Sequence, residues 1–401
     1  MNVYVTPALE AVDREVLRLI EGLRKEMSWQ VSEPKRWFGS LRRMTLAKAV
    51  QGSNSVEGYN ASLDDVAAAI DGEPTLDASD ETAMALAGYR DAMTYVLQVA
   101  QDSEVQIDEG LLKAMHFMMI KHDLPKWPGR WWPGEIYVRE EENGRIVYEG
   151  PDADVVPGLI SSMLESLNDD DGPVLVRAAM AHLNLVMIHP FRDGNGRMAR
   201  ALQTLVLAKE RIVAPVFSSI EEYIGRNTKE YYQVLGEVGR GAWHPGNNAL
   251  PWVRYCLTAH YRQAKTHLRR IEEVQTLYAR CGELATQHSL PERVVGPLLE
   301  ASFGLRVRNA TYRHVVEQTE GDAISDLTAS RDLKLLVDAK LLRPHGQNRG
   351  RYYTGDDAIR TMWADVRGSR PPRDEYDPFV VARESLQLGL DVGAAGEPTS
   401  G

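Results

Sequence analysis

The stretch that decides the fold is HPFRDGNGRMAR, residues 189–200 of the 401-residue chain. An apolar run, residues 176–188, precedes it with hydrophobic side chains at three- and four-residue spacing, which predicts a buried helix. The segment that follows, residues 198–209, consists mostly of strong helix formers and predicts a second helix. The stretch is therefore a turn between two helices of a mainly α-helical protein.

The turn itself reads Asp-Gly-Asn-Gly, residues 193–196. Residues of these types tolerate positive φ and can orient successive backbone N–H groups toward one point. Because a helix N-terminus follows directly, its free amides and its dipole face the same volume, which favours phosphate. Arg197 and Arg200 lie three residues apart, so their guanidinium groups can bind two phosphate groups from one helix face. The turn predicts a polyphosphate site.

Two further residues of the stretch suit chemistry on a phosphate. Asp193 offers a carboxylate of the kind that holds Mg²⁺ together with phosphate oxygens and water. His189 titrates near neutral pH and can accept a proton from an incoming hydroxyl. A lone histidine at a helix end is more often a cap or a core residue, and a lone Gly-Asn-Gly is more often a plain turn. Their combination within twelve residues favours a catalytic site.

The stretch resembles the signature of the Fic family, His-Pro-Phe-x-Asp/Glu-Gly-Asn-Gly-Arg-x-x-Arg, at every specified position. The resemblance implies a transferase that moves AMP from ATP to a hydroxyl side chain of a protein, itself included. It implies that His189 is the catalytic base, that Asp193 holds Mg²⁺ and that the phenylalanine packs into the core. The implied nucleotide site comprises Phe191, Asp193, Gly194, Asn195, Gly196, Arg197 and Arg200.

A second motif, Ser-Asn-Ser-Val-Glu-Gly, occupies residues 53–58. By itself it reads as a helix end, with Gly58 as the C-cap and with Ser53 and Glu57 in solvent. It also matches the inhibitory pattern Ser/Thr-x-x-x-Glu-Gly/Asn of one class of the Fic family. That resemblance implies that Glu57 pairs with Arg200 and that the enzyme is autoinhibited.

Residues 125–157 break the helical pattern. Two groups of β-forming residues flank an Asn-Gly pair at 143–144, which is the strongest short signal for a hairpin turn. Relatives in the Fic family carry a flap before the motif that pairs with a strand of the target, by β-augmentation. The resemblance places this flap at about residues 130–150 and assigns the contact with the target to Ile136, Tyr137 and Val138.

Two adjacent tyrosines follow the motif. Tyr231 and Tyr232 resemble the family segment whose tyrosines border the adenine. As isolated aromatic residues they would more often belong to a core.

Residues 289–357 resemble a winged helix, with a recognition helix near 328–342 and a wing that contains Arg349 and Arg351. Within residues 331–353 there are six Lys/Arg and two Asp, whereas the whole chain has a net charge of −11. This local positive charge predicts either DNA or an acidic protein as a partner, and domains of this kind serve both purposes.

Length and pattern together predict a mainly α chain of several domains. An N-terminal helical region covers residues 1–104 and the Fic core residues 105–288, ending in a long helix over 251–288. The winged-helix-like domain at 289–357 precedes an extension, 358–401, whose tail after Glu384 is expected to be disordered.

Composition indicates the cellular compartment in which the protein is expected. The two cysteines, Cys256 and Cys281, have neither metal-ligand nor disulfide-framework spacing, which fits a reducing cytoplasm. No segment has the pattern of a signal peptide or of a membrane span. A homodimer is left open.

The leading hypothesis is an autoinhibited protein adenylyltransferase that uses ATP and Mg²⁺. One alternative is a Fic-type enzyme that transfers another phosphate-containing group or removes AMP with water. The other is a DNA-binding winged-helix regulator whose Fic core only senses nucleotide, although such a sensor would not need His189 as a base.

Overall fold

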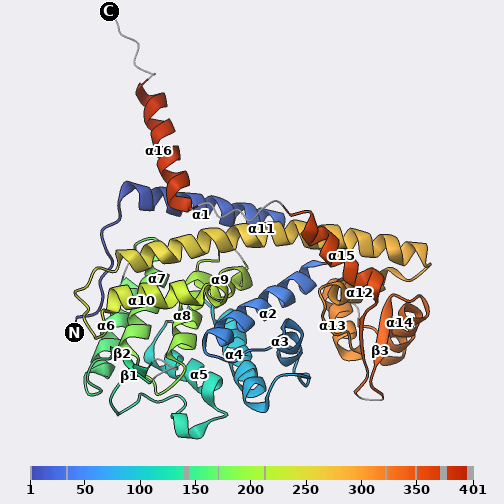
Figure 1. Ribbon diagram of the computed structural model, residues 1–401, viewed down its shortest axis with the longest axis horizontal. Helices are drawn as coiled ribbons and strands as arrows, with labels where there is room; N and C mark the ends of the chain where they lie inside the picture. Colours follow the sequence, from blue (N-terminus) through green and yellow to red (C-terminus); the bar gives the residue numbers. More distant parts are fainter. Residues whose placement is uncertain are drawn as a thin grey trace, which may run out of the picture.

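A single long helix, α11 (Leu250–Gln287), runs along most of the length of the molecule and joins its two ends (Figure 1). This computed structural model describes residues 2–32, 35–139, 144–169, 171–211, 214–320, 323–347, 350–370 and 377–394. The sequence predicted this helix over 251–288, in close agreement. Most of the side chains that α11 buries are apolar, and Trp252 near its start is fully buried; the buried polar side chains are those of His260, Gln263, His267, Arg270 and Glu273.

The centre of the half that contains the motif is the helix pair α7 (Val174–Ile188) and α8 (Asn195–Lys209), which enclose the motif turn. Nearly every side chain of α7 is buried, as its continuous apolar sequence requires. The indole N–H of Trp252 donates to the Ala179 carbonyl at 2.7 Å and fixes α11 against α7. The surrounding elements are α5 (Glu109–Ile120), the 3₁₀ turn η1 (Leu124–Lys126), α6 (Val156–Asp169), η2 (Pro215–Phe217), α9 (Glu221–Arg226) and α10 (Thr228–Gly239).

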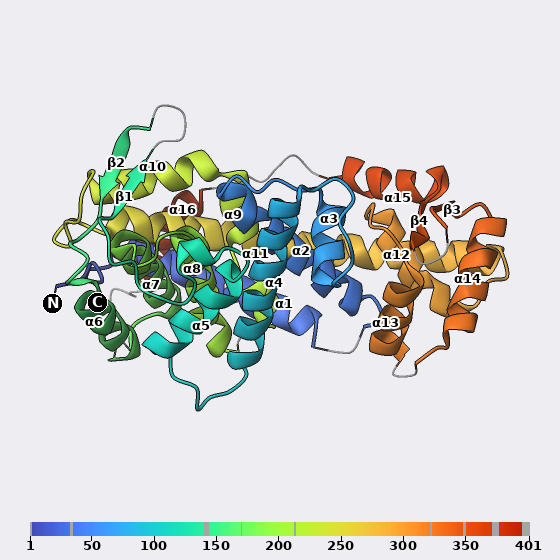
Figure 2. The same cartoon turned by 90° about the horizontal axis from the view of Figure 1, so that it is seen from below.

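Four helices precede this core: α1 (Ala11–Gln30), α2 (Phe38–Val56), α3 (Leu63–Ile70) and α4 (Asp80–Val99). Helix α1 packs along α11, and α2 lies against α9 (Figures 1 and 2). At the crossing of α2 and α9 the backbones touch, because a Cβ at Gly225 would lie 2.5 Å from Gly52 Cα. This close approach needs glycine at both positions and fixes the position of α2 on the core.

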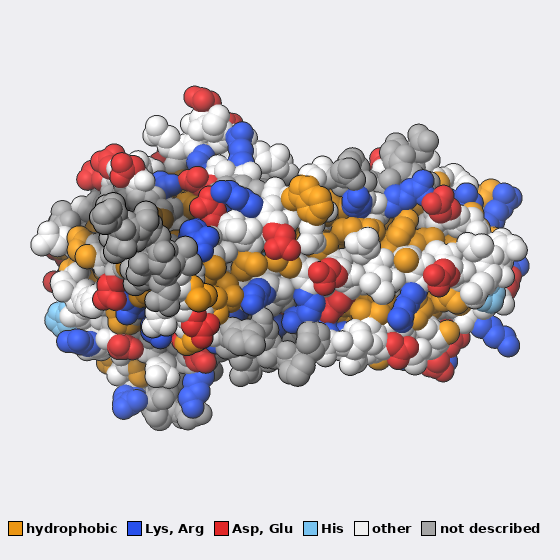
Figure 3. Space-filling model, turned by 90° about the horizontal axis from the view of Figure 1, so that it is seen from above, with side chains coloured by type: hydrophobic (Ala, Val, Ile, Leu, Met, Phe, Trp, Pro, Cys, Tyr) orange, Lys and Arg blue, Asp and Glu red, His pale blue; other side chains and the backbone are white. Residues whose placement is uncertain are grey.

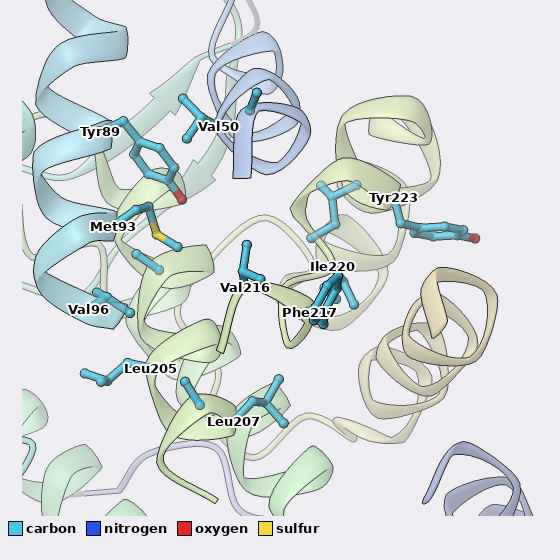
Figure 4. Close-up of a cluster of buried hydrophobic side chains, with 14 of the residues drawn as sticks. Val50, Tyr89, Met93, Val96, Leu205, Leu207, Val216, Phe217, Ile220 and Tyr223 are labelled. Atoms are coloured by element: carbon cyan, nitrogen blue, oxygen red, sulfur yellow. The ribbon is translucent and has the colours of Figure 1, made fainter. Parts of the chain in front are cut away.

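A shared apolar cluster ties these helices to the core (Figure 4). Val50 of α2, Met93 and Val96 of α4 and Leu205 of α8 belong to it, and all four are almost completely buried. The segment around η2 contributes Val216, Phe217 and Ile220. Because α2 shares side-chain packing with α8, it belongs to one folded unit with the motif helix.

The predicted hairpin consists of β1 (Tyr137–Arg139) and β2 (Ile146–Glu149), which pair antiparallel with Val138 opposite Tyr148. The predicted turn residue Asn143 lies outside the described residues. On its other side β2 is held at Glu149, which exchanges backbone hydrogen bonds with Gly241 and Trp243, both of 2.9 Å. Tyr148 donates its hydroxyl to the Met187 carbonyl at 2.7 Å and anchors the hairpin to α7.

The C-terminal segment follows α11 in the order η3 (Glu292–Val294), α12 (Val295–Ser302), α13 (Asn309–Glu320), α14 (Asp326–Asp338), β3 (Leu342–His345), β4 (Tyr352–Gly355) and α15 (Asp357–Gly368). Strands β3 and β4 pair antiparallel, and Val307 forms a bridge with Tyr353 of β4. Three helices followed by a hairpin correspond to the elements that the sequence predicted for residues 289–357. Their assignment as a winged helix stays a prediction, and Arg349 of the expected wing lies outside the described residues.

Ion pairs attach this segment to the N-terminal helices. Arg306 pairs with Asp64 and Asp65 of α3, and Arg308 pairs with Glu73 just after that helix. Arg43 of α2 bridges Asp71 and Glu300, the latter on α12. The region around α2 and α3 is therefore held between the half that contains the motif and the C-terminal segment (Figure 2).

The prediction of a disordered tail after Glu384 was wrong for most of its length. Residues Pro378–Ala394 form helix α16, which packs against α1. Phe379 and Ala382 are buried, and the guanidinium of Arg254 lies 5.6 Å from the centre of the Phe379 ring. The small and polar residues of the tail suggested disorder, but α16 is anchored by Phe379 and Ala382 before Glu384, and just after it Ser385 donates its hydroxyl to Glu15 of α1 at 2.8 Å. Residues 395–401 lie outside the described residues.

In the part of the chain that the structure describes, no helix combines the length and the hydropathy that crossing a membrane requires. On the face shown in Figure 3, basic and acidic side chains are intermixed over the surface.

Candidate functional site

The motif turn is built by two residues with left-handed backbones. His189 ends α7 with φ 54° and ψ 52°, and Gly194 precedes α8 with φ 79°. Asn195 follows Gly194 directly. Its side chain accepts a hydrogen bond from the Phe191 N–H at 2.9 Å and donates to the Phe191 carbonyl at 2.8 Å. Asn195 thus closes the turn by hydrogen bonding to backbone groups, and both polar atoms of its side chain are engaged in these bonds.

Phe191 anchors the turn in the core. Its ring is 1% exposed, stacks on the His116 ring at 3.7 Å and contacts Trp131. The imidazole of His116 accepts a hydrogen bond from the Gly129 N–H at 2.9 Å and, from its other nitrogen, donates to the Asp193 carbonyl at 3.0 Å. Burial lowers the pKa of His116 to about 4, so the ring is neutral and can play both roles. His116 therefore holds both the motif turn and the segment that leads to the hairpin.

The geometry of His189 suits a general base. Its Nδ1 lies 3.1 Å from the Val186 carbonyl oxygen, which can only accept, so Nδ1 carries the proton and Nε2 keeps its lone pair. Burial lowers the pKa of His189, although the nearby carboxylates of Glu57 and Asp193 act in the opposite direction. The ring is therefore neutral at pH 7 and able to accept a proton.

Arg197 and Arg200 lie side by side under the N-terminus of α8, and each is 1% exposed. Arg197 Nε and Nη1 and Arg200 Nη1 are buried and have no hydrogen-bond partner among the described residues. Buried guanidinium donors without partners are costly unless a ligand supplies acceptors. Together with the free amides of the helix, they provide the positive charge that a polyphosphate needs.

The carboxylate of Asp193 lies at the edge of this positive site. Its Oδ2 is 2.8 Å from Lys126 Nζ and 3.6 Å from Arg197 Nη2, while its Oδ1 accepts the Gly194 N–H at 2.6 Å. Burial opposes ionisation, but Arg197 and Lys126 more than offset it and lower the pKa of Asp193. Asp193 is thus a fixed anion, which Lys126 partly neutralises.

Glu57 reaches into the same site from the end of α2. Its Oε1 lies 2.7 Å from Arg200 Nη2, and Ser53 adds two acceptors for Arg200, its hydroxyl at 2.8 Å and its carbonyl at 2.9 Å. A Cβ at Gly196 would lie 2.5 Å from Glu57 Oε1, so only glycine lets the carboxylate approach the first turn of α8 this closely. Gly58 has φ 83°, which ends α2 and directs Glu57 inward.

Comparison with known proteins shows what the chain is similar to. Residues 106–207 match the Fic/DOC family, and the motif lies within that range. The chain is 28% identical over 265 residues to protein adenylyltransferase fic-1 of Caenorhabditis elegans, covering 64% of this chain and 47% of that protein. It is 24% identical over 299 residues to protein adenylyltransferase Fic of Nematostella vectensis, covering 70% and 62%. The chain thus spans about half the length of the Caenorhabditis relative.

Solved structures of Fic proteins share the fold. A Fic family protein from Desulfovibrio desulfuricans superposes with a TM-score of 0.56 at 21% identity, over 88% of this chain and 98% of that one. A Fic domain containing signaling protein from Bacteroides thetaiotaomicron gives 0.52 at 20% identity, over 64% and 97%. At these identities the likeness shows the fold alone. It confirms a mainly helical Fic fold.

A cavity of about 380 Å³ opens above the Fic motif. Glu57, Tyr59, Lys126, Arg192, Asp193 and Tyr232 line it, together with Val56. Tyr232 is half exposed and donates its hydroxyl to the Val56 carbonyl at 3.2 Å. The cavity therefore lies between the Fic motif, the end of α2 that carries Glu57, and α10.

The two predicted adenine-bordering tyrosines have different positions. Tyr232 lines the cavity, whereas Tyr231 is 1% exposed and its hydroxyl lies 3.1 Å from His182 Nε2. Tyr231 also places its ring 5.9 Å from the Arg200 guanidinium. Tyr231 therefore lies on the buried side of the site, where its ring packs against Arg200. Among the predicted motif residues, Phe191 and the Asn195 side chain likewise support the turn from within.

In the hairpin, Ile136 is 5% exposed and packs inward, while Tyr137 is exposed and Val138 half-buried. Within the described residues β1 pairs with β2 alone, so its outer edge is available for a further strand. The hairpin thus brings an open strand edge to the Fic core, as the flap prediction requires. Its contact with a target stays a prediction.

Sequence reasoning missed three residues of the site. Lys126 pairs with Asp193, His116 holds the Asp193 carbonyl, and Tyr59 places its ring 5.1 Å from the Arg197 guanidinium. Tyr59 directly follows Gly58 of the second motif, so its place in the sequence could have indicated that it lies near the site. His116 and Lys126 lie in segments without a recognisable pattern, and only the fold brings them to the motif.

Proposed function

We propose that this protein is an autoinhibited adenylyltransferase that moves AMP from ATP to a hydroxyl side chain of a protein, itself included. The observation that carries the proposal is the arrangement at the N-terminus of α8. His189 Nε2 keeps a free lone pair, and three donor nitrogens of two buried arginines, Arg197 Nε and Nη1 and Arg200 Nη1, have no acceptor among the described residues. The names of the relatives from Caenorhabditis and Nematostella support the same activity.

In the proposed reaction, the hydroxyl oxygen of the target attacks the α-phosphorus of ATP. Its proton passes to His189 Nε2, the bond between the α-phosphorus and the bridging oxygen breaks, and pyrophosphate leaves. Arg197 and Arg200 stabilise the charge that develops on the leaving pyrophosphate, because both are fixed and shielded from water. The neutral Nδ1–H tautomer of His189 is maintained by the Val186 carbonyl.

A magnesium ion fits the residues at the edge of the site. Asp193 is a hard carboxylate donor beside the phosphate site, and Mg²⁺ commonly binds through one carboxylate together with substrate phosphates. The described residues contain no cluster of three or more His, Cys, Asp or Glu that could hold a metal alone, so ATP would have to supply the remaining ligands. When bound, the ion would neutralise phosphate charge in the transition state.

Inhibition is proposed to follow from competition between anions. The Glu57 carboxylate occupies the Arg200 donor Nη2 and lies against Gly196, in the volume that a terminal phosphate of ATP requires. ATP bound beside Glu57 would have its phosphates displaced from in-line attack. A displacement of about 1 Å can lower a rate on the order of a hundredfold.

The target is proposed to dock on the open edge of β1, so that its backbone pairs with residues 137–139. Main-chain pairing places a hydroxyl beside His189 with little dependence on sequence. In the C-terminal segment Arg343 is paired with Asp356 and Asp357, and Leu327 and Leu335 of α14 are exposed. These features favour a protein over DNA as the partner of this segment.

Mass spectrometry of the full chain incubated with ATP and Mg²⁺ tests the reaction. We expect an AMP adduct on a serine, threonine or tyrosine, which increases in a Glu57→Gly variant and disappears when His189→Ala is added. UTP, CTP and a phosphocholine donor are tested in parallel. An adduct from one of these in place of AMP would support transfer of another group, and loss of AMP from a modified protein would support the hydrolytic alternative.

Asp193 and Lys126 are expected to respond to Mg²⁺ in opposite directions. Asp193→Ala removes the metal ligand, so activity should be lost and should recover poorly with excess Mg²⁺. Lys126→Met removes a cation 2.8 Å from the same carboxylate, so half-maximal activity should require several-fold less Mg²⁺. Both variants are assayed by Mg²⁺ titration at saturating ATP. An unchanged Mg²⁺ requirement in both would contradict the role of Asp193.

A further inference from the structure

A second cavity, of about 340 Å³, lies where α2, α9, α11 and α15 meet. It shares no lining residue with the cavity above the Fic motif. Its walls carry six basic side chains: Lys48, Arg226, Arg269, Arg270, Arg367 and Arg370. Only Glu222 and Glu273 carry negative charge, so six positive and two negative groups leave a formal charge of +4 in a chain of −11.

Both acidic residues are already engaged. Glu222 accepts from Arg270 Nη2 with both carboxylate oxygens, at 2.7 and 2.9 Å, and Glu273 is held by Arg370. Lys48 makes no ion pair or hydrogen bond with any described residue. Both acidic residues of the lining are therefore already paired with arginines, and the basic side chains of the lining outnumber them.

Two of the cations are held in positions that are unfavourable without a ligand. Arg270 is 6% exposed, and its Nη1 is buried with no hydrogen-bond partner among the described residues. Lys48 is half-buried, and burial together with Arg270 lowers the pKa of its ammonium group to about 8. A bound anion would supply both groups with an acceptor.

One wall of the cavity is aromatic. Trp363 of α15 packs against Phe303 with ring centres 5.4 Å apart, and the guanidinium groups of Arg367 and Arg370 lie over its ring at 5.9 and 5.8 Å. The cation–π contacts restrict both arginines, and the donors Nε and Nη2 of Arg370 are also held by Glu273. A rigid set of guanidinium groups of this kind is suited to phosphate oxygens.

We propose that this junction cavity binds a small phosphorylated molecule with at least two negative charges, held by Lys48, Arg270 and Arg367, separately from the nucleotide site of the Fic motif. The volume admits a molecule of this size and excludes a polymer. The ligand would join α2 to α11 and α15, three elements from different parts of the chain. Its binding is independent of the reaction proposed above.

Calorimetric titration of the full chain with inorganic tripolyphosphate and with pyrophosphate, without Mg²⁺, tests the site. All proteins carry Arg197→Ala, so that the Fic site contributes little to the signal. We expect saturable binding and a rise in Tm with ligand. Adding Lys48→Met with Arg367→Ala should weaken binding at least tenfold. The matched control, Arg42→Ala with Arg360→Ala, removes the same charge from exposed positions of α2 and α15 and should change affinity less than twofold.

The single variant Lys48→Met distinguishes a ligand-binding site from a cluster of charges that only stabilises the fold. Because Lys48 is a poorly solvated cation without a partner, its replacement should leave Tm without ligand unchanged or higher, while the rise in Tm with tripolyphosphate becomes smaller. Equal affinity in the cavity and control variants, or no saturable binding to either anion, would overturn the proposal. If the double variant does not fold, Arg367→Ala alone gives the same comparison, because that side chain is exposed.

Discussion

A Glu57→Gly enzyme is expected to transfer AMP on the order of a hundredfold faster than the natural chain. The reason is that the carboxylate leaves the Arg200 donor Nη2 and the space beside Gly196. Both then become available to the terminal phosphate of ATP. The gain should appear chiefly in kcat, because ATP can still bind the natural enzyme with its phosphates displaced. Initial rates with labelled ATP and a constant acceptor measure it.

Two companion variants define the cause. Glu57→Gln keeps the length of the side chain and removes its charge, so its activity should lie between those of the natural and glycine forms. Glu57→Gly with Arg200→Ala should return to low activity, because the gain depends on the arginine that Glu57 releases. If the glycine variant and the natural chain modify the same acceptor at equal rates, the end of α2 is only a helix terminus and the inhibition proposal is wrong.

The loss of Glu57 should also reduce stability in the absence of nucleotide. Arg200 is 1% exposed and would keep two hydrogen bonds, both with Ser53, beside its contact with the Tyr231 ring. Losing a hydrogen bond to a charged group costs about 1.5–3 kcal/mol, so Tm should fall and should recover on addition of ATP.

His189→Ala, introduced into the active Glu57→Gly chain, is expected to lower AMP transfer by roughly 10² to 10⁴-fold. The imidazole acts on the attacking hydroxyl, whereas the arginines and the amides of α8 hold the nucleotide. ATP affinity measured by calorimetry should therefore stay within about twofold of the parent protein. Undiminished transfer would exclude His189 as the base, and a parallel loss of ATP binding would assign it to the nucleotide site.

The same assay has a pH signature. Burial lowers the pKa of His189, so the reactive neutral form persists below the ordinary histidine pKa of about 6.5. As pH falls through this lowered pKa, the ring becomes protonated and activity declines. The acid limb of kcat in the Glu57→Gly enzyme should therefore lie below about 6.5. The Glu57 carboxylate favours the protonated ring, so its removal lowers the pKa of His189 further. The acid limb of the Glu57→Gly enzyme should therefore lie at a lower pH than that of the natural chain.

The local geometry of the site could be predicted from sequence because it depends on neighbouring residues. Gly194 with its positive φ, the helix that starts at Asn195 and the spacing of the two arginines all follow from one short stretch. The pairing of Glu57 with Arg200 was predicted only through family resemblance. By composition alone, residues 53–58 read as a solvated helix end, since nothing local specifies what α2 packs against.

Other features depend on tertiary packing that no local pattern encodes. Lys126 reaches Asp193 because η1 folds back over the motif, and a single lysine in a loop gives no indication of this. Tyr231 and Tyr232 are adjacent in sequence, yet α10 directs one into the core and the other into the cavity. Residues 385–394 continue a helix, α16, that is anchored on the protein before Glu384, and the composition of the tail alone does not indicate this.

The contact between Gly52 and Gly225 limits which residues can replace Gly52 during evolution. Even a methyl group at Gly52 would overlap the carbonyl oxygen of Glu221, so any other residue there must force α2 away from α9. Ser53 follows directly and holds Arg200, so such a shift would also withdraw the Glu57 carboxylate from Arg200. A random substitution at this crossing would thus weaken the fold and, if the proposed inhibition holds, raise the proposed activity at the same time. Selection for a controlled activity would then preserve a glycine that lines neither cavity.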